Sequence, residues 1–293
     1  MGRILLTDWE GPIAGALVRA LLRDPRYDVR VLAPSAPPDW VAEACEVVRA
    51  ATASPEHLLG CDALVDLAAC RPADREALSA WPLSLAASWQ RGAAAAATAA
   101  CEAHTERLIH IGAPVGTIAG DGPAIAAAKG AAALAAAARA QAGISACVLW
   151  PFGPLWPQLD SGMPGSPGIL ARAVEGAIAG EGVDLPPTPW KGAYTAVEEI
   201  AAATVLALES DSCGEIDIAG GWRPDGEQLA SIVSELAGRR LKVRRRASGD
   251  AHERRPDRAG ARRALGFSTA GVPRRSIEAI VASLAGEASA ARG

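Results

Sequence analysis

Residues 3–22 read RILLTDWEGPIAGALVRALL, and this stretch decides the fold. Its beginning, Arg3–Thr7, is a short apolar run of strand length, whereas Ile13–Leu22 places apolar residues at helical spacing. A strand, a short turn and a helix in this order predict the first β–α unit of a parallel sheet.

The same alternation continues through the first half of the chain. Further strands are expected at 29–32, 63–69, 108–111 and 146–150, and helices at 93–103 and 124–140. This pattern predicts a doubly wound, Rossmann-like parallel α/β sheet over residues 1–150, with a ligand crevice at the carboxyl ends of its strands.

Prolines interrupt the second half, and residues 151–293 are expected to form a smaller lobe over the crevice, with segments that return to the sheet. Within it, helices are expected at 169–179, 196–209, 224–237 and 274–284, and a strand at 215–218.

Composition excludes several classes of protein. The 293 residues carry 29 Lys and Arg against 33 Asp and Glu, and 21% are charged, which excludes a disordered chain and a strongly basic nucleic-acid binder. The six cysteines are scattered without a C-x-x-C pair, as expected for buried thiols in a reducing compartment. With no signal-peptide pattern and no long apolar run, the sequence predicts a cytoplasmic protein without a membrane partner.

Five motifs in the same order resemble the extended short-chain dehydrogenase/reductase family, the NAD-dependent epimerase/dehydratases, over nearly the whole chain. They are the strand–turn–helix at 3–22, CDALVDLAA at 61–69 (similar to D-x-V-x-H-L-A-A), VLWPF at 148–152 (L-R-P-F), AVEEIA at 196–201 (V-x-D-V-A) and DRAGARRALG at 257–266 (D-x-x-K-A-R-x-x-L-G). The resemblance implies an NAD(P) cofactor, hydride transfer on a sugar nucleotide or another carbonyl compound, and a homodimer made through helices 93–103 and 124–140.

The first turn departs from the family pattern T-G-x-x-G-x-x-G, since residues 7–14 read TDWEGPIA. Gly11 remains, but Asp8 and Ala14 replace the outer glycines, and Asp8 and Glu10 bring carboxylates to the place of a pyrophosphate. Alternatively, Asp8 points outward and caps the helix.

The residues after strand 29–32 also lack the acid or arginine that holds the cofactor ribose in this family. We therefore expect NAD(P) to bind weakly or not at all. If it does bind, the resemblance assigns Gly11, Ile13 and Ala14 to its contacts.

The family's Y-x-x-x-K motif falls on residues 125–129, IAAAK, where Ile125 replaces the tyrosine and Lys129 remains. Isoleucine donates no proton, and the serine position near residues 113–115 has no hydroxyl, Thr117 being the nearest. Hydride transfer is therefore not expected. Lys129 is either a relic on an alanine-rich helix or a group that binds an anion or forms a Schiff base.

Four tryptophans align with crevice-lining positions of the family: Trp9, Trp89, Trp150 and Trp156. They either fill the core or line a cleft for a flat or apolar ligand. The four histidines, at 57, 104, 110 and 252, are isolated in the sequence and show no metal or triad spacing.

Residues 239–275 carry 13 Lys and Arg but only three acids. This basic segment is either a solvated face, which docks on the acidic part of a second copy, or a site for an anionic partner.

Three functions remain open. The first is a non-redox binding or partner subunit that takes a small molecule or a protein in the crevice. The second is a cofactor-independent isomerase, cyclase or lyase of a biosynthetic pathway, with Lys129, Thr117, Asp8 and Glu10 as its catalytic candidates. The third is a residual NAD(P)-dependent sugar-nucleotide epimerase/dehydratase or reductase. The sequence does not decide between an enzyme and a binding protein.

Overall fold

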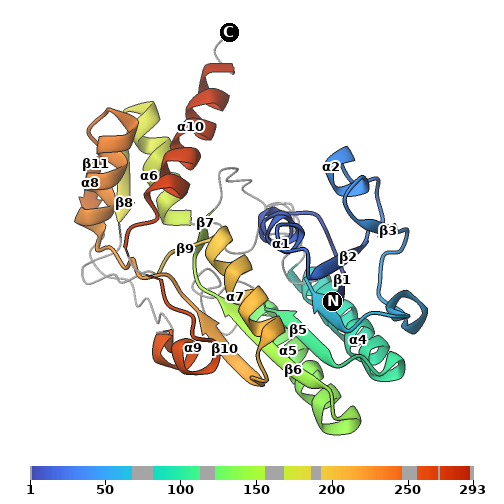
Figure 1. The fold of residues 1–293 in the computed structure, drawn as a ribbon. Helices are drawn as coiled ribbons and strands as arrows, with labels where there is room; N and C mark the ends of the chain where they lie inside the picture. Colours follow the sequence, from blue (N-terminus) through green and yellow to red (C-terminus); the bar gives the residue numbers. More distant parts are fainter. Residues whose placement is uncertain are drawn as a thin grey trace.

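The computed structural model describes residues 2–67, 82–112, 123–155, 168–185, 193–245, 256–269 and 271–290. Its centre is a seven-stranded sheet with the strand order β10-β6-β5-β4-β1-β2-β3, in which all neighbouring strands are parallel (Figure 1). The strands are β1 (Gly2–Leu6), β2 (Tyr27–Leu32), β3 (Glu46–Val48), β4 (Ala63–Asp66), β5 (Arg107–Ile111), β6 (Ser145–Pro151) and β10 (Gly214–Ile218). The predicted doubly wound sheet is therefore confirmed.

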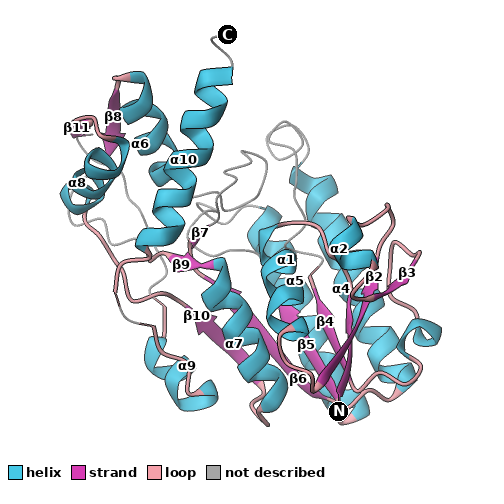
Figure 2. Cartoon of the chain, turned by 45° about the horizontal axis from the view of Figure 1, so that its top comes forward, coloured by secondary structure: helices cyan, strands magenta, loops and turns pink. Residues whose placement is uncertain are grey.

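Helices cover both faces of this sheet, as Figure 2 shows. The helices on one face are α1 (Pro12–Leu22), α7 (Val197–Glu209) and α9 (Arg258–Leu265); those on the other are α4 (Pro82–Ala103) and α5 (Pro123–Ala142). Because both faces are covered, the strands are apolar on both sides, as is usual for parallel sheets.

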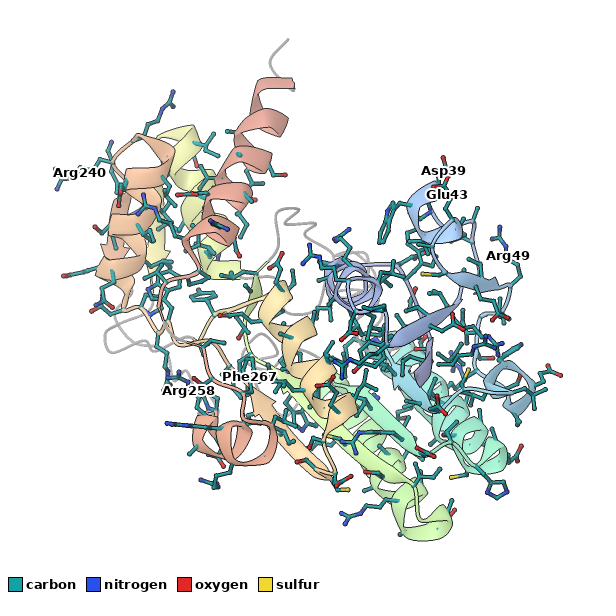
Figure 3. All side chains as sticks on the ribbon, in the orientation of Figure 1. Asp39, Glu43, Arg49, Arg240, Arg258 and Phe267 are labelled. Carbon is teal, nitrogen blue, oxygen red and sulfur yellow. The ribbon has the colours of Figure 1, made fainter. Side chains whose placement is uncertain are left out.

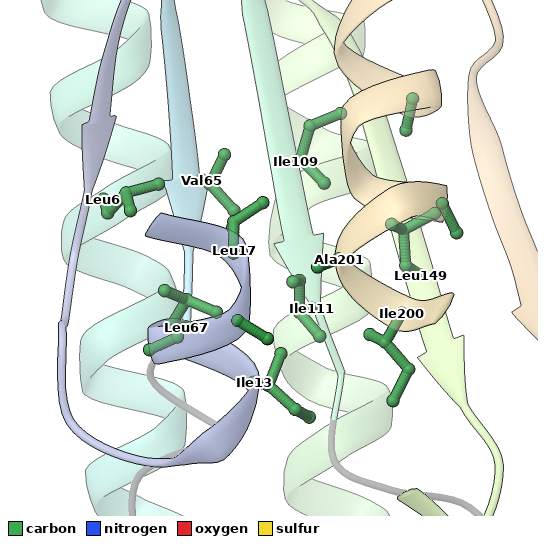
Figure 4. Close-up of a cluster of buried hydrophobic side chains, with 14 of the residues drawn as sticks. Leu6, Ile13, Leu17, Val65, Leu67, Ile109, Ile111, Leu149, Ile200 and Ala201 are labelled. Carbon is green, nitrogen blue, oxygen red and sulfur yellow. The ribbon is translucent and has the colours of Figure 1, made fainter. Parts of the chain in front are cut away.

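Successive residues of each strand face opposite layers. Leu6, Val65 and Ile109 pack under α1 and α7 (Figure 4), whereas their neighbours Leu5 and Leu64 pack under α4 and α5. Alanines dominate the buried face of α4, so this helix packs closely on the sheet and on α5.

A second lobe has its own hydrophobic core. It contains α6 (Gly168–Ala179), α8 (Gly226–Ala237), α10 (Arg274–Ala290) and a parallel pair of strands, β8 (Gly182–Leu185) and β11 (Lys242–Arg245). Two short paired strands, β7 (Pro154–Leu155) and β9 (Thr195–Ala196), lie between this lobe and the sheet (Figure 1). β10, α7 and α9 follow residue 150 in the sequence but lie with the sheet.

The structure corrects one detail of the predicted order. The third strand of the chain is β3, which the sequence did not indicate, so the strand expected at 63–69 is the fourth. β3 is only three residues long and is half-exposed, so it carries no readable periodicity. The short helices α2 (Asp39–Ala42) and η1 (Pro55–Leu58) were also not predicted. Among the described helices, none is both long and apolar enough to cross a membrane.

Candidate functional site

The turn between β1 and α1 lies at the carboxyl end of β1, beside the middle of the sheet. Gly11 ends the turn and is the N-cap residue of α1. Its φ is 89°, a backbone conformation that residues other than glycine rarely adopt. Pro12 follows at the first helical position and contributes no N–H group. Ile13 and Ala14 are each 1% exposed and pack in the core.

Asp8 is buried inside this turn, with 1% of its surface exposed. Its Oδ1 accepts hydrogen bonds from the backbone N–H groups of Trp9, at 2.7 Å, and Glu10, at 2.9 Å. An aspartate that binds the backbone just after itself stabilises a tight turn. The alternative that Asp8 points outward and caps α1 is therefore wrong, because Asp8 is buried, and the N-cap residue of α1 is Gly11, with no side-chain cap hydrogen bond.

Glu10 connects the turn to the segment after β2. The hydroxyl of Ser35 donates to Glu10 Oε1 at 2.7 Å, so a serine and a carboxylate meet where the family holds the cofactor ribose. Trp9, between the two acids, is half-buried against the core under α1. Its indole N–H is buried and has no acceptor among the described residues.

A row of buried polar side chains crosses the sheet at the ends of β1, β4 and β5. The Thr7 hydroxyl lies 3.1 Å from Asp66 Oδ1, and Asp66 Oδ2 lies 2.8 Å from His110 Nδ1. Asp66 is 1% and His110 is 1% exposed, and His110 Nε2 is buried without a partner in the described chain. Parallel register places Asp66 opposite His110, so both project toward α4 and α5.

Two of the histidines that are isolated in the sequence have side-chain partners in the structure: His110 contacts Asp66, and His57 Nδ1 lies 3.0 Å from the Ser54 hydroxyl. Spacing along the sequence missed the Asp66–His110 pair because 44 residues separate the partners. A usable signal existed, because Asp66 and His110 each stand near the carboxyl end of a strand whose neighbouring residues are apolar.

A cavity of about 90 Å³ lies beside this row. Its polar lining includes Thr7, Thr52, Asp66, Ser88 and Arg91, which come from the ends of β1 and β4, the segment after β3, and α4. Typical ligand pockets measure about 300–1,000 Å³, so this cavity has room only for a few waters or a small polar group.

Two of the four predicted cleft-lining tryptophans are buried in one hydrophobic cluster. Trp89 is 1% and Trp150 is 4% exposed, and both pack between the sheet and α4 or α5. Trp150 also donates its indole N–H to Glu215 Oε2 at 2.8 Å. Its ring lies against Gly112, where a Cβ atom would come within 2.6 Å of it, so Trp150 requires glycine at that position.

The predicted catalytic residues are only partly brought together. Asp8 and Glu10 share one turn, whereas Lys129 is exposed on α5 and forms no ion pair within the described part of the chain. Thr117 and Trp156 lie outside the described residues.

The basic segment 239–275 does not form one surface element. Its described residues divide between β11 and α10 in the second lobe and α9 beside the sheet. Arg274 binds Glu235 at 2.7 Å and Glu278 at 2.9 Å, so part of the positive charge is already paired within the chain.

Comparison with solved structures identifies the fold. The chain superposes on the UDP-glucose 4-epimerase of Thermotoga maritima with a TM-score of 0.76 and 18% identity, over 98% of this chain and 99% of that one. The UDP-glucuronic acid 4-epimerase of Bacillus cereus, solved with UDP-glucuronic acid and NAD, gives 0.76 and 17%, over 96% and 98%. The UDP-glucose 4-epimerase of Thermus thermophilus, solved with NAD, gives 0.74 and 19%, over 97% and 99%.

No protein-family model matches the sequence, and no curated protein matches it. At the level of fold, the resemblance to extended short-chain dehydrogenase/reductase epimerases is confirmed over nearly the whole chain.

Proposed function

We propose that this protein is a non-redox binding protein or partner subunit built on the fold of the NAD-dependent UDP-sugar epimerases. One observation carries the proposal: the buried Asp8 carboxylate sits inside the β1–α1 turn and accepts two of its backbone N–H groups. In dinucleotide-binding sheets this turn holds a pyrophosphate through unpaired N–H groups at the start of the helix.

The residues of the turn do not fit that group. The N–H groups of Trp9 and Glu10 already donate to Asp8, and Pro12 has no N–H to offer. Two like charges about 4 Å apart near a protein surface repel by about 4 kcal/mol, so the carboxylates of Asp8 and Glu10 oppose a phosphate. We therefore derive no nicotinamide chemistry for this site.

Two further observations support a non-redox role. Ile125 stands in the place of the family's proton-donating tyrosine, and Lys129, four residues later, is exposed on α5. The cofactor-free enzyme gains no support from the geometry, because Asp8 is held by turn N–H groups and Glu10 by Ser35. A general acid or base needs a group that is free to reach the substrate.

We infer that the ligand or partner binds at the carboxyl edge of the sheet, where open α/β sheets bind their ligands. Around the 90 Å³ cavity, the Ser88 hydroxyl and the Arg91 guanidinium offer hydrogen bonds to a small polar group, whereas Thr7 and Asp66 are bonded to each other.

The first test is isothermal titration of the full chain with NAD, NADH, NADP and NADPH, together with mass spectrometry of any molecule that copurifies. We expect no heat of binding and no copurified dinucleotide. Micromolar binding of any of the four would overturn the proposal and favour the alternative of an NAD(P)-dependent oxidoreductase.

A pair of double variants tests whether the carboxylates of the turn prevent dinucleotide binding. Asp8→Asn with Glu10→Gln removes both charges from the turn but leaves an amide oxygen to accept the N–H groups, so we expect dinucleotide binding to become measurable. Asp39→Asn with Glu43→Gln removes two exposed charges, one from the start of α2 and one from its C-cap (Figure 3), and is expected to leave dinucleotide binding unchanged. An equal response of both variants would show that the turn charges are not the obstacle.

A further inference from the structure

A second, larger cavity lies at the other end of the sheet from the β1–α1 turn. It measures about 260 Å³ and begins at Ala219, just after the carboxyl end of β10, four strands away from β1. Its walls come from α9 and from the segment that follows it. The lining residues are Ala219, Arg258, Ala259, Ala261, Arg262, Phe267, Ser268 and Thr269.

The fold builds this cavity through a sharp reversal after α9. Gly266 ends the helix with φ = 66°, the left-handed conformation that commonly terminates helices, and the chain then turns back along α9. Leu265 and Phe267, on either side of this glycine, are buried in the core under α7 and anchor the reversal. Figure 3 shows Arg258 and Phe267 close to each other where α9 begins.

The lining is positively charged. Arg258 and Arg262 are one helical turn apart on α9, so their side chains share one face. Arg258 Nη2 donates to the Thr269 carbonyl at 2.9 Å, which holds its guanidinium at the cavity while other N–H groups remain available. Arg262 forms no ion pair with any described residue, and the described residues that line the cavity include no carboxylate.

Neighbouring acids have other partners. Asp257 caps α9 by accepting the Gly260 N–H at 2.8 Å and lies 3.6 Å from Arg263, which does not line the cavity. Glu199 interacts with Arg258, but it accepts the Ala196 N–H, and burial raises the pKa of its carboxyl. The positive charge at the cavity is therefore only partly compensated.

We propose that this cavity binds a small phosphate-bearing molecule, with Arg258 and Arg262 on the phosphate oxygens and Ser268 supplying a hydroxyl donor. Guanidinium groups match phosphate geometry through paired N–H donors, and arginine is the usual residue where such recognition is needed. The volume suits one phosphate group with a small organic part and is too small for a dinucleotide. This inference does not rest on the function proposed for the β1–α1 turn.

The test is a titration of the full chain with inorganic pyrophosphate and with orthophosphate at constant ionic strength. Calorimetry measures the binding, and the thermal unfolding midpoint measures the stabilisation by the bound ion. We expect saturable binding and a raised midpoint. Arg262→Gln and Arg258→Gln should each weaken binding at least tenfold, because each removes one guanidinium from the phosphate.

Arg263→Gln is the matched control, because it removes the same charge from the same helix outside the cavity, and it should leave the dissociation constant within twofold. Arg262→Lys keeps the charge without the planar donor pair and should bind more weakly than the unmodified protein but more tightly than Arg262→Gln. Absence of saturable binding, or an equal loss in the Arg262→Gln and Arg263→Gln variants, would overturn the proposal.

Discussion

At the scale of single residues, Asp8 and Asp66 are two of the buried carboxylates of the described chain, and each is compensated differently. Asp8 accepts backbone N–H groups of its own turn, whereas Asp66 is held by the Thr7 hydroxyl and the His110 ring. Burying a carboxylate without such donors destabilises the folded state strongly. Both sets of hydrogen bonds are therefore needed for the stability of the fold and are also part of the site.

The Asp66–His110 pair leads to the first stability prediction. His110→Phe keeps a ring of similar shape but removes the donor that faces Asp66 Oδ2, so a buried carboxylate loses one partner. We expect a loss of about 3 kcal/mol in the free energy of unfolding, measured by urea denaturation.

A second substitution separates the lost pair from a change in packing. Asp66→Asn combined with His110→Phe removes the charge together with its partner, so the double variant should be more stable than His110→Phe alone. If His110→Phe costs less than 1 kcal/mol, or if the double variant is the least stable, the pair does not carry the expected energy.

At the scale of elements, α7 shows how burial and capping compete. Glu199 in its first turn accepts the Ala196 N–H at 3.0 Å, which stabilises the start of the helix. The same position is half-buried, and burial is the main cause that raises the pKa of Glu199 above its ordinary value of 4.5.

The raised pKa gives a stability prediction with a definite sign. The ionised form of Glu199 is less favourable in the folded than in the unfolded chain, so stability is lost as the pH rises through the folded pKa. Glu199→Gln keeps an oxygen for the Ala196 N–H but carries no charge. We expect this variant to be the more stable protein at pH 7, and its advantage to disappear below pH 4.5 in urea denaturation at several pH values.

Glu198→Gln is the matched control, because Glu198 is exposed in the same helical turn. The negative charge of Glu198 interacts favourably with the positive end of the helix dipole at the start of α7. The substitution should therefore be neutral or slightly destabilising at pH 7. If both variants behave alike, the effect belongs to the helix dipole and not to burial of Glu199.

At the scale of the whole molecule, the sheet is completed by segments from the second half of the chain. α7 packs against α1, and β10 pairs with β6 in parallel register. Ile200 of α7 and Ile216 of β10 are buried in the same cluster as Ile109 and Leu149. The first half alone therefore leaves an apolar face of its sheet uncovered.

A truncated chain tests this dependence. A fragment of residues 1–155 retains β1 to β6 but loses α7 and β10, so it should bind a hydrophobic dye such as ANS and unfold in urea without a cooperative transition. The full chain, measured in parallel, should unfold cooperatively. Cooperative unfolding of the fragment without dye binding would show that the first half folds independently.

The sequence by itself determined the strand–helix alternation, and with it the parallel sheet, because apolar periodicity is a local property of neighbouring residues. It also indicated the unusual turn, since Asp8, Glu10 and Gly11 are adjacent in the chain. It missed β3, whose three residues are too few for a period to appear. Thr117 and Trp156 lie outside the described residues, so their predicted roles remain predictions.

Only the tertiary structure decided which distant residues meet. The Thr7–Asp66–His110 row depends on the register of three strands, and the fit of Trp150 over Gly112 depends on the pairing of two. The arginine-lined cavity depends on the return of the chain after Gly266. These contacts join residues that lie far apart in sequence, or on opposite sides of a turn, and spacing along a chain does not encode such distances.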